Sequence, residues 1–259
     1  MTQSQPTQSS KEEESMSVKD KVIIITGASS GIGAATVRAL AKKHAKLVIG
    51  ARRLDRLNEL KDEFPDEEII PQKVDVTDYD QVKALVKTAM DNFSRIDVLY
   101  NNAGVMPVNA LNKLARDEWK QILDVNVMGV LNGIAAVLPI MEKKQSGHIL
   151  ATDSVAGHVV VPDHVVYNGS KFAVRAIMEG LRQEEHDKNI RTSIVSPGAV
   201  ATELYNSIND PKNCQDEING ENSIGLTADN IASAIVYAID APDNMDVNEI
   251  LIRPIKQDV

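Results

Sequence analysis

Short runs of β-branched and other apolar residues alternate about seven times with helical patterns along this chain of 259 residues. The first run, at residues 22–25, is apolar throughout, as expected for a strand buried on both faces of a sheet. Similar runs lie at residues 47–49, 69–74, 96–100, 148–151, 191–195 and 249–252. Because crossovers between parallel strands are usually helical, the alternation predicts an α/β fold, a doubly wound and mostly parallel sheet of seven strands.

The intervening segments have the apolar spacing of helices. The clearest apolar stripe consists of Val82, Leu85, Val86, Ala89 and Phe93. Thr77 is predicted to be the N-cap of this helix, and a second helix is expected over residues 32–43. No linker rich in proline or glycine interrupts the pattern, so residues 16–259 are predicted to form a single domain.

The first fifteen residues are rich in Gln, Ser, Thr and Glu and are predicted to be a disordered tail. They contain neither the apolar run of a signal peptide nor the arginines of a mitochondrial presequence. The longest mostly apolar stretch, residues 129–141, is interrupted by Asn132 and is shorter than the roughly 20 residues of a membrane span. We therefore expect no membrane segment. The single cysteine, Cys214, favours a cytoplasmic location.

The net charge of −9 argues against nucleic-acid binding, which depends on attraction to phosphate, and against an anionic membrane surface. The aromatic content of 3% also disfavours a stacking platform for single strands. Any polyanionic ligand must therefore be held by local groups.

A glycine-rich turn follows the first predicted strand, with the sequence Thr-Gly-Ala-Ser-Ser-Gly-Ile-Gly at residues 26–33. Gly27, Gly31 and Gly33 allow a tight turn that brings backbone amides and a helix N-terminus against a pyrophosphate. Ser29 and Ser30 can add hydroxyl donors. The turn therefore predicts dinucleotide binding; a purely structural turn is the alternative.

The end of the second predicted strand distinguishes NADP from NAD. An acidic residue at this point would bind the ribose hydroxyls, but the chain has Arg52 and Arg53. Their guanidinium groups can bind the 2′-phosphate, which favours NADP, with Arg52 as the first candidate. Two solvated surface arginines are the alternative. Asp75, after the third strand, can bind the adenine amino group or cap the next helix.

Several motifs in this order resemble the short-chain dehydrogenase/reductase superfamily, in its NADP-dependent form. They are the turn at 26–33, the Asn-Asn-Ala-Gly sequence at 101–104, the set Asn126, Ser154, Tyr167 and Lys171, and Pro197-Gly198 followed by Thr202. The resemblance covers residues 19–254 and implies a Rossmann-like fold and a homotetramer or homodimer. It also implies NADP(H) contacts at Gly27, Ser29, Ser30, Gly31, Ile32, Gly33, Arg52, Arg53, Asp75, Val76, Asn102, Ala103, Gly104, Tyr167, Lys171, Pro197, Gly198, Val200 and Thr202.

The expected chemistry depends on a tyrosine and a lysine four residues apart on one helix face. Tyr167 is predicted to exchange a proton with the substrate oxygen, and the charge of Lys171 to lower the tyrosine pKa. Ser154 is predicted to hydrogen-bond the substrate oxygen. The resemblance implies that Lys171 also holds the nicotinamide ribose and that Asn126 holds a water of the proton relay. No metal is required.

Apolar residues beside this centre, among them Val159, Val160 and Val161, favour a neutral ketone, aldehyde or secondary alcohol as substrate. The alternatives are 3-hydroxy acids or serine-like substrates and, more remotely, a non-catalytic NADP-binding sensor. Residues 199–226 are predicted to be a mobile lid. The histidines at 148, 158 and 164 are expected to be loop residues rather than metal ligands, and Asp153 is a departure from the family pattern.

Overall fold

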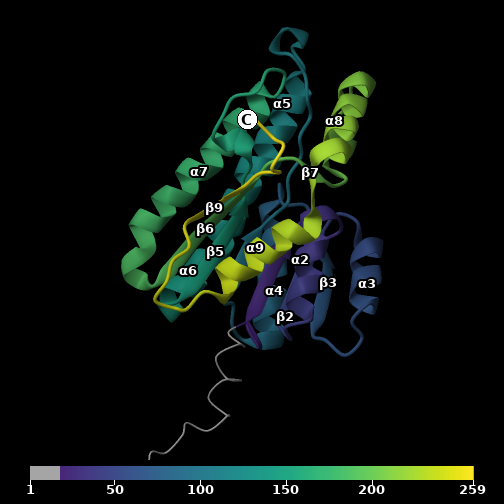
Figure 1. Ribbon diagram of the computed structural model, residues 1–259. Helices are drawn as coiled ribbons and strands as arrows, with labels where there is room; N and C mark the ends of the chain where they lie inside the picture. Colours follow the sequence, from purple (N-terminus) through teal and green to yellow (C-terminus); the bar gives the residue numbers. More distant parts are fainter. Residues whose placement is uncertain (1–17, 259) are drawn as a thin grey trace, which may run out of the picture.

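Seven parallel strands form one sheet in the computed structural model, which describes residues 18–258 (Figure 1). Their order is β3-β2-β1-β4-β5-β6-β9. The strands are β1 (Val22–Thr26), β2 (Lys46–Ala51), β3 (Ile69–Lys73), β4 (Val98–Asn101), β5 (Gly147–Thr152), β6 (Ile190–Pro197) and β9 (Glu249–Ile252). Each predicted strand is present, with bounds shifted by about two residues or fewer. The predicted α/β class and the doubly wound sheet are therefore confirmed.

Helices cover both faces of the sheet and complete two apolar cores. They are α2 (Gly31–Ala41), α3 (Leu54–Asp62), α4 (Tyr79–Phe93), α5 (Arg116–Leu123), α6 (Gly129–Lys144), α7 (Val165–Glu185), α8 (Pro211–Ile224) and α9 (Ala228–Asp240). Within β1, Ile23 and Ile25 pack with α2, α3 and α9, whereas Val22 and Ile24 pack with α4, α6 and α7. Because successive strand residues point to opposite faces, a strand between two helical layers must be apolar throughout.

The start of α4 differs from the prediction. Asp78, not Thr77, is the N-cap, and its carboxylate accepts hydrogen bonds from the amides of Asp80 and Gln81. Thr77 instead donates its hydroxyl to Asp75. Asp and Thr both cap helices well, and the sequence offers them at adjacent positions, so the spacing alone left the boundary one residue uncertain.

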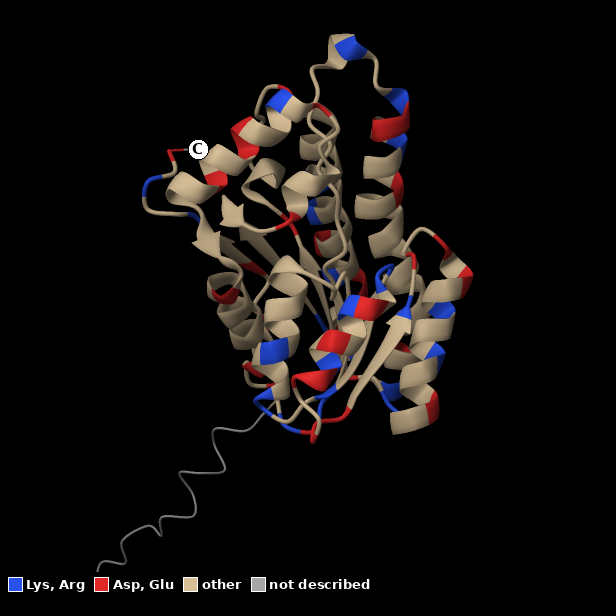
Figure 2. Ribbon diagram, turned by 90° about the vertical axis from the view of Figure 1, so that its right-hand side faces the viewer, with Lys and Arg blue, Asp and Glu red and all other residues tan. Residues whose placement is uncertain are grey.

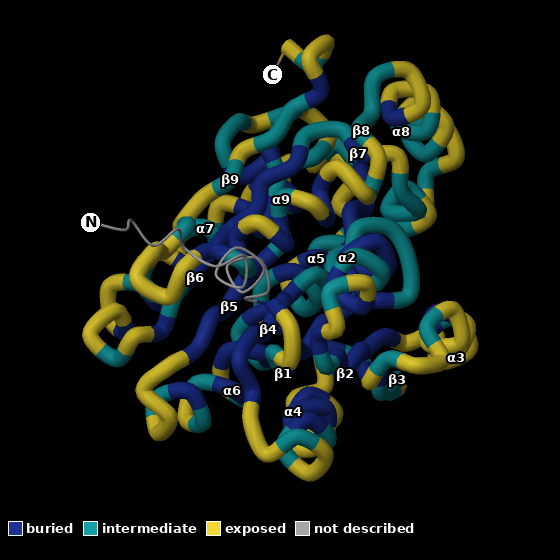
Figure 3. The backbone as a smooth tube through the Cα atoms, turned by 60° about the horizontal axis from the view of Figure 1, so that its bottom comes forward, coloured by how far each residue is buried: buried dark blue, intermediate teal, exposed yellow. Residues whose placement is uncertain are grey.

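A crevice for ligands forms where the winding of the sheet changes direction, between the neighbouring strands β1 and β4. The glycine-rich turn leaves β1 there, and residues 101–104 leave β4 beside it. The segment predicted to be a lid lies above this edge. It forms β7 (Val200–Ala201), a 3-10 turn η6 (Leu204–Ser207), helix α8 and β8 (Leu226–Thr227). The inner strands β1, β2, β4, β5 and β6 are largely buried, whereas many residues of α3 and α8 are exposed (Figure 3).

Helices α5 and α6 are joined by a π-helical turn, η3 (Asp124–Met128), into one helical stretch from Arg116 to Lys144. The stretch is long and apolar enough to cross a membrane by length and composition alone, contrary to the shorter apolar run read from the sequence. A core helix of an α/β domain has the same character, and α6 packs against α4, β4 and β5. Lysine, arginine and acidic residues are spread over the outer helices (Figure 2).

Candidate active site

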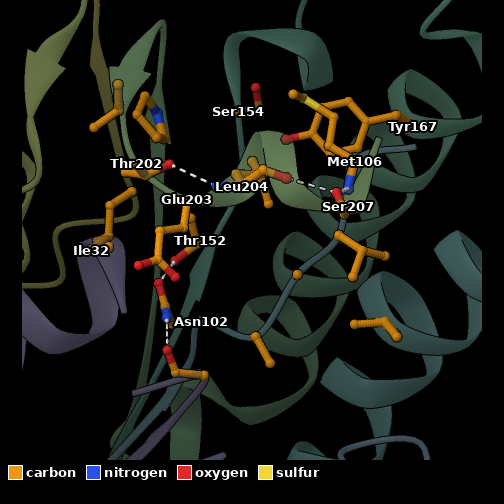
Figure 4. A pocket seen from close by; sticks show the side chains of 18 of the residues that line it. Ile32, Asn102, Met106, Thr152, Ser154, Tyr167, Thr202, Glu203, Leu204 and Ser207 are labelled. Atoms are coloured by element: carbon orange, nitrogen blue, oxygen red, sulfur yellow. Dashed lines mark hydrogen bonds between the residues drawn. The ribbon is translucent and has the colours of Figure 1, made fainter. Parts of the chain in front are cut away.

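A cavity of about 670 Å³ lies at the carboxyl edge of the sheet, between the glycine-rich turn and the start of α7. Figure 4 shows Ser154, Tyr167 and Met106 at one side and Ile32 and Asn102 below them. All the residues predicted to bind the cofactor or to act in catalysis line this cavity, except Gly33 and Asn126. Of the three valines expected beside the reacting centre, Val161 lines the cavity, whereas Val159 and Val160 do not. The fold thus brings residues from widely separated parts of the sequence to one site.

The glycine-rich turn is shaped for the close approach of a ligand. Gly27 has a φ of +65°, and a Cβ there would lie 2.7 Å from the Ala103 Cα. A Cβ on Gly33 would overlap the Gly27 carbonyl oxygen. Ser30 is the N-cap of α2, but its side chain makes no capping hydrogen bond. The first amides of α2 therefore have no side-chain acceptor at the cap and can bind an anion, as a pyrophosphate site requires.

Asn102 joins the strand ends that form the floor of the cavity. Its Nδ2 donates to the carbonyl oxygens of Thr26 and Gly27, at 3.2 and 3.1 Å. Its Oδ1 accepts from Thr152 Oγ1 at 3.0 Å. Side-chain hydrogen bonds thus fix β1, β4 and β5 relative to one another, and with them the turn after β1.

Arg53 lies directly against the glycine-rich turn. Its guanidinium donates to Ser30 Oγ at 2.8 Å and to Glu203 Oε2 at 3.1 Å. Arg56 also binds Glu203, at 2.7 Å. Arg52 lines the cavity as well. The arginine end of the cavity therefore offers two guanidinium groups, one of which is partly neutralised by Glu203.

Asp75 forms a local turn beside the cavity and does not cap α4. Its Oδ1 accepts from the amide and the hydroxyl of Thr77, at 3.0 and 2.8 Å. The capping interpretation is wrong because Asp78 occupies that position. Asp75 still lines the cavity, where adenine binding stays a prediction.

Tyr167 and Lys171 lie one turn apart on α7 and are both buried. Lys171 Nζ donates to the Thr152 carbonyl at 2.7 Å and lies 5.6 Å from the centroid of the Tyr167 ring. Burial raises the pKa of Tyr167 above its usual value, although a hydrogen bond with Ser154 opposes this shift. Burial lowers the pKa of Lys171, and the charge of Asp153 opposes that shift.

The net direction for Tyr167 is thus the reverse of the prediction. The ammonium of Lys171 is directed to Thr152 rather than to the phenol oxygen, so desolvation decides the balance. With its pKa raised by burial, Tyr167 is a neutral phenol at physiological pH, which is the form that donates a proton.

Ser154 lines the cavity, and its Oγ accepts from the Ala156 amide at 3.1 Å. Asn126 lies deeper, in η3, with its Oδ1 and Nδ2 each 2.9 Å from the backbone of Val105. Asn126 Nδ2 also donates to Ser170 Oγ at 3.2 Å. The direct contacts of Asn126 therefore hold the loop after β4.

Asp153, unexplained by the sequence, is a buried carboxylate behind Ser154. Its Oδ2 accepts from Ser196 Oγ at 3.0 Å and lies 3.6 Å from His158 Nε2. Arg175 approaches to 4.0 Å and donates to the Gly157 carbonyl. Burial raises the pKa of Asp153, while the charge of Lys171 opposes the shift. Asp153 thus ties the turn that carries Ser154 to β6 and α7.

Replacing Asp153 by alanine is expected to lower the free energy of unfolding by about 1–3 kcal/mol, because the Ser196 hydroxyl loses a buried acceptor and Arg175 loses an ion-pair partner. Urea unfolding followed by circular dichroism measures this. Glu179→Ala, which removes an exposed carboxylate from α7, is the control and should change stability much less. Equal stability of Asp153→Ala and the wild type would contradict this role.

Sequence reasoning missed the side chains contributed by α8 and the start of α7. His164, Glu217 and Glu221 all line the cavity. His164 lies 3.8 Å from Glu217; burial lowers the pKa of the histidine, but hydrogen bonds to Glu217 and Pro162 give a net rise. His148 is also not a loop residue, since it lies in β5 and meets Ser193 at 2.8 Å. The sequence predicted a lid over residues 199–226, but it did not indicate that this segment contains the helix α8, which places Glu217 and Glu221 in the cavity.

Comparisons with known proteins agree with this architecture. The family model of the short chain dehydrogenases matches residues 21–213. An uncharacterized oxidoreductase of Staphylococcus saprophyticus is 54% identical over 93% of this chain and 98% of its own length. The chain therefore belongs to the short-chain dehydrogenase family and is an oxidoreductase of that family.

Solved structures of this family carry nicotinamide cofactors of both kinds. A short-chain dehydrogenase/reductase from Burkholderia phymatum in complex with NAD has 29% identity and a TM-score of 0.84, covering 91% of this chain and 89% of that one. The closed form of a serine dehydrogenase with NADP+ has 27% identity and a TM-score of 0.86, covering 92% and 96%. The similar structures therefore do not distinguish NAD from NADP, and the preference must be argued from the residues of this chain.

Proposed function

We propose that the protein is an NADP(H)-dependent oxidoreductase that transfers a hydride between the nicotinamide and a carbonyl compound or secondary alcohol. The observation that carries this proposal is the single cavity, which joins a glycine-rich turn at one end to Ser154, Tyr167 and Lys171 at the other. A ketone or aldehyde with an apolar flank is the favoured substrate. Met106 and Ala156 support it, because they line the cavity and form an apolar cluster with Tyr167.

The cavity residues fit a dinucleotide. The amides at the start of α2, with Ser29 and Ser30, would hold the pyrophosphate, and Arg52 and Arg53 the 2′-phosphate. Asp75 and Val76 would flank the adenine, and the nicotinamide half would lie along Asn102, Ala103, Gly104, Pro197, Gly198, Val200 and Thr202. When bound, NADPH supplies the hydride.

The side chains of this chain would handle the proton and the developing charge. In the reductive direction Tyr167 donates its phenolic proton to the carbonyl oxygen, and in oxidation it accepts the proton of the alcohol. Ser154 hydrogen-bonds the same oxygen. Lys171 would hold the nicotinamide ribose and, through its charge, favour the phenolate after the transfer. Asn126 would hold a water of the proton relay, as the family resemblance implies, and its hydrogen bonds to Val105 would fix the loop after β4.

Initial rates with NADPH and a panel of neutral ketones and aldehydes test the proposal against its alternative. Reduction of neutral carbonyl compounds is expected, followed as loss of NADPH absorbance. Activity confined to 3-hydroxy and 3-oxo acids, or to serine-like substrates, would favour the alternative that the protein is a dehydrogenase of such compounds. The similarity to the structure of a serine dehydrogenase supports testing this alternative. Tight NADPH binding without any turnover would instead indicate a sensor.

Replacing Arg53 by alanine is expected to raise the Kd for NADPH about tenfold or more, because charge-assisted hydrogen bonds contribute about 1.5–3 kcal/mol. The Kd for NADH, which lacks the 2′-phosphate, should change little. Fluorescence titration with both cofactors measures the two values, and Arg38→Ala on α2 is the control, since Arg38 pairs with Glu63 outside the cavity. Equal weakening of NADPH and NADH would refute a 2′-phosphate contact.

We further propose a cytoplasmic homotetramer or homodimer. The family resemblance implies that the helices at residues 111–144 and 166–187 pack between subunits. Apolar side chains are exposed there, including Leu123 and Met128 near the α5–α6 junction and Phe172 on α7. Leu251 on β9 is also exposed and would lie near another interface. Light scattering coupled to gel filtration measures the mass in solution; a monomer would contradict this assembly.

A further inference from the structure

The substrate side of the cavity, beyond Tyr167, is acidic. Helix α8 contributes Glu217 and Glu221, which are four residues apart and therefore share one helix face. Among the described residues, the lysine and arginine side chains lining the cavity are Lys171, which is bound to the Thr152 carbonyl, and the arginine pair at the opposite end. His164 is the one further basic group, and it faces Glu217. A substrate carboxylate would meet two carboxylates here with one histidine to balance them.

The carboxylate of Glu221 has few neighbouring groups that would stabilise its negative charge. Glu221 is only 6% exposed, and its Oε2 accepts one long hydrogen bond, at 3.4 Å, from the Thr202 amide. Burial, with the charge of Glu217, raises the pKa of Glu221 to about 7 against the effect of that amide. A nearby cation would favour the ionised form and gain a partly desolvated carboxylate as its partner.

Asn168, which lines the cavity, has an acceptor without a partner in the described part of the chain. Asn168 is 2% exposed, and its Nδ2 donates to the Val161 carbonyl at 3.0 Å. Within residues 18–258, its Oδ1 has no hydrogen-bond partner. Buried polar atoms are nearly always paired, so this Oδ1 remains available to a hydrogen-bond donor of a ligand that reaches it from the cavity.

The acidic groups also act on the reacting phenol. After burial, the charges of Asp153, Glu217 and Glu221 are further causes that raise the pKa of Tyr167. Both glutamates line the same cavity as Tyr167, and Glu217 lies 3.8 Å from His164, three residues before Tyr167. Met106 and Leu204 line the cavity with them and supply apolar contact for alkyl groups around a charged nitrogen.

We propose that the preferred substrates carry an ammonium group, which Glu217 and Glu221 bind while Tyr167 and Ser154 engage the carbonyl or alcohol oxygen. The inference rests on the proposed function and specifies its substrate class. Neutral carbonyl compounds are turned over less efficiently, and carboxylate-bearing ones least, because like charges meet at α8.

Three ketones that differ in charge test this preference. They are 1-(trimethylammonio)propan-2-one, its neutral isostere 4,4-dimethylpentan-2-one, and the anion 4-oxopentanoate. With saturating NADPH, the cationic ketone is expected to show at least about tenfold higher kcat/KM than the isostere, as expected for a partly desolvated ion pair. The same order is expected for the Kd of each ketone in the NADPH complex of Tyr167→Phe, where hydride transfer is stalled.

Charge-removing variants assign the preference to α8. Glu217→Gln and Glu221→Gln should each lower the ratio of cationic to neutral kcat/KM, and the double variant should bring it to within about twofold of unity. Asp216→Asn, an exposed acidic position on the same helix and outside the cavity, is the matched control and should keep the wild-type ratio. NADPH titration of each variant reports whether a glutamate contacts the cofactor instead.

The outcomes separate the two proposals. Turnover of the cationic and neutral ketones with equal kcat/KM and equal Kd would overturn the ammonium inference and leave the proposed function standing. A ratio unchanged in the double variant, or variants that weaken NADPH binding without changing the ratio, would also overturn it. If no ketone is reduced but the cation still binds more tightly, the proposed function fails while the ammonium site is supported.

Discussion

Replacing Tyr167 by phenylalanine is expected to lower kcat by about 10²–10⁴-fold, the usual contribution of a positioned general acid. The substitution removes the phenolic oxygen alone. The ring stays packed with Met106 and Ala156, so the fold and the cavity should persist. Stopped-flow or steady-state oxidation of NADPH measures the loss.

The control for this variant is cofactor binding. NADPH titration should give a Kd within a few fold of the wild type, because the proposed pyrophosphate and 2′-phosphate contacts come from the other end of the cavity. Tyr205→Phe removes a hydroxyl from the neighbouring apolar cluster and should retain turnover. Full activity in Tyr167→Phe would exclude the tyrosine as the proton donor.

Replacing Ser154 by alanine is expected to cause the second large loss of activity. The loss of one donor to the developing oxyanion is expected to lower kcat by about 10²–10³-fold. Part of the loss has a second source, since a hydrogen bond with Ser154 opposes the rise of the Tyr167 pKa. The pH profile of alcohol oxidation should therefore shift its acid limb upward, because the base in that direction is the ionised phenol.

Ser154→Thr distinguishes this role from simple packing, since threonine keeps the hydroxyl at the same position. Partial recovery of kcat in the threonine variant, with the acid limb back toward its wild-type position, is the expected result. If Ser154→Ala changes KM alone and leaves kcat and the pH profile unchanged, Ser154 binds substrate without acting on the reacting oxygen.

The sheet and the cofactor end of the site could be predicted from the sequence because both depend on local patterns. Residues 22–25 are apolar at every position, as a strand between two helical layers requires. The glycines that follow indicate a tight turn against a ligand. Gly27 confirms the tight turn, because its positive φ and its approach to Ala103 leave no room for a side chain.

The substrate end could not be predicted because it depends on contacts between distant segments. Glu217 and Glu221 belong to a polar helix whose sequence contains no motif, and they reach the cavity that Tyr167 lines only when residues 199–226 fold back over the sheet edge. The role of Asp153 could not be predicted for the same reason, since its partners lie on β6, on α7 and in the turn at His158. The pKa of Tyr167 was predicted in the wrong direction because spacing shows that Lys171 is near but not where its ammonium points.

Transfer of deuterium from NADPH labelled at the nicotinamide C4 tests the central proposal most directly. In a single turnover with a ketone from the charge series, one of the two C4-labelled diastereomers should deliver its deuterium to the carbinol carbon of the product alcohol, as detected by mass spectrometry. The same experiment with Tyr167→Phe should give little product in the same time. Product without deuterium from either diastereomer, or no product with any ketone, would contradict the assignment as an NADP(H)-dependent carbonyl oxidoreductase.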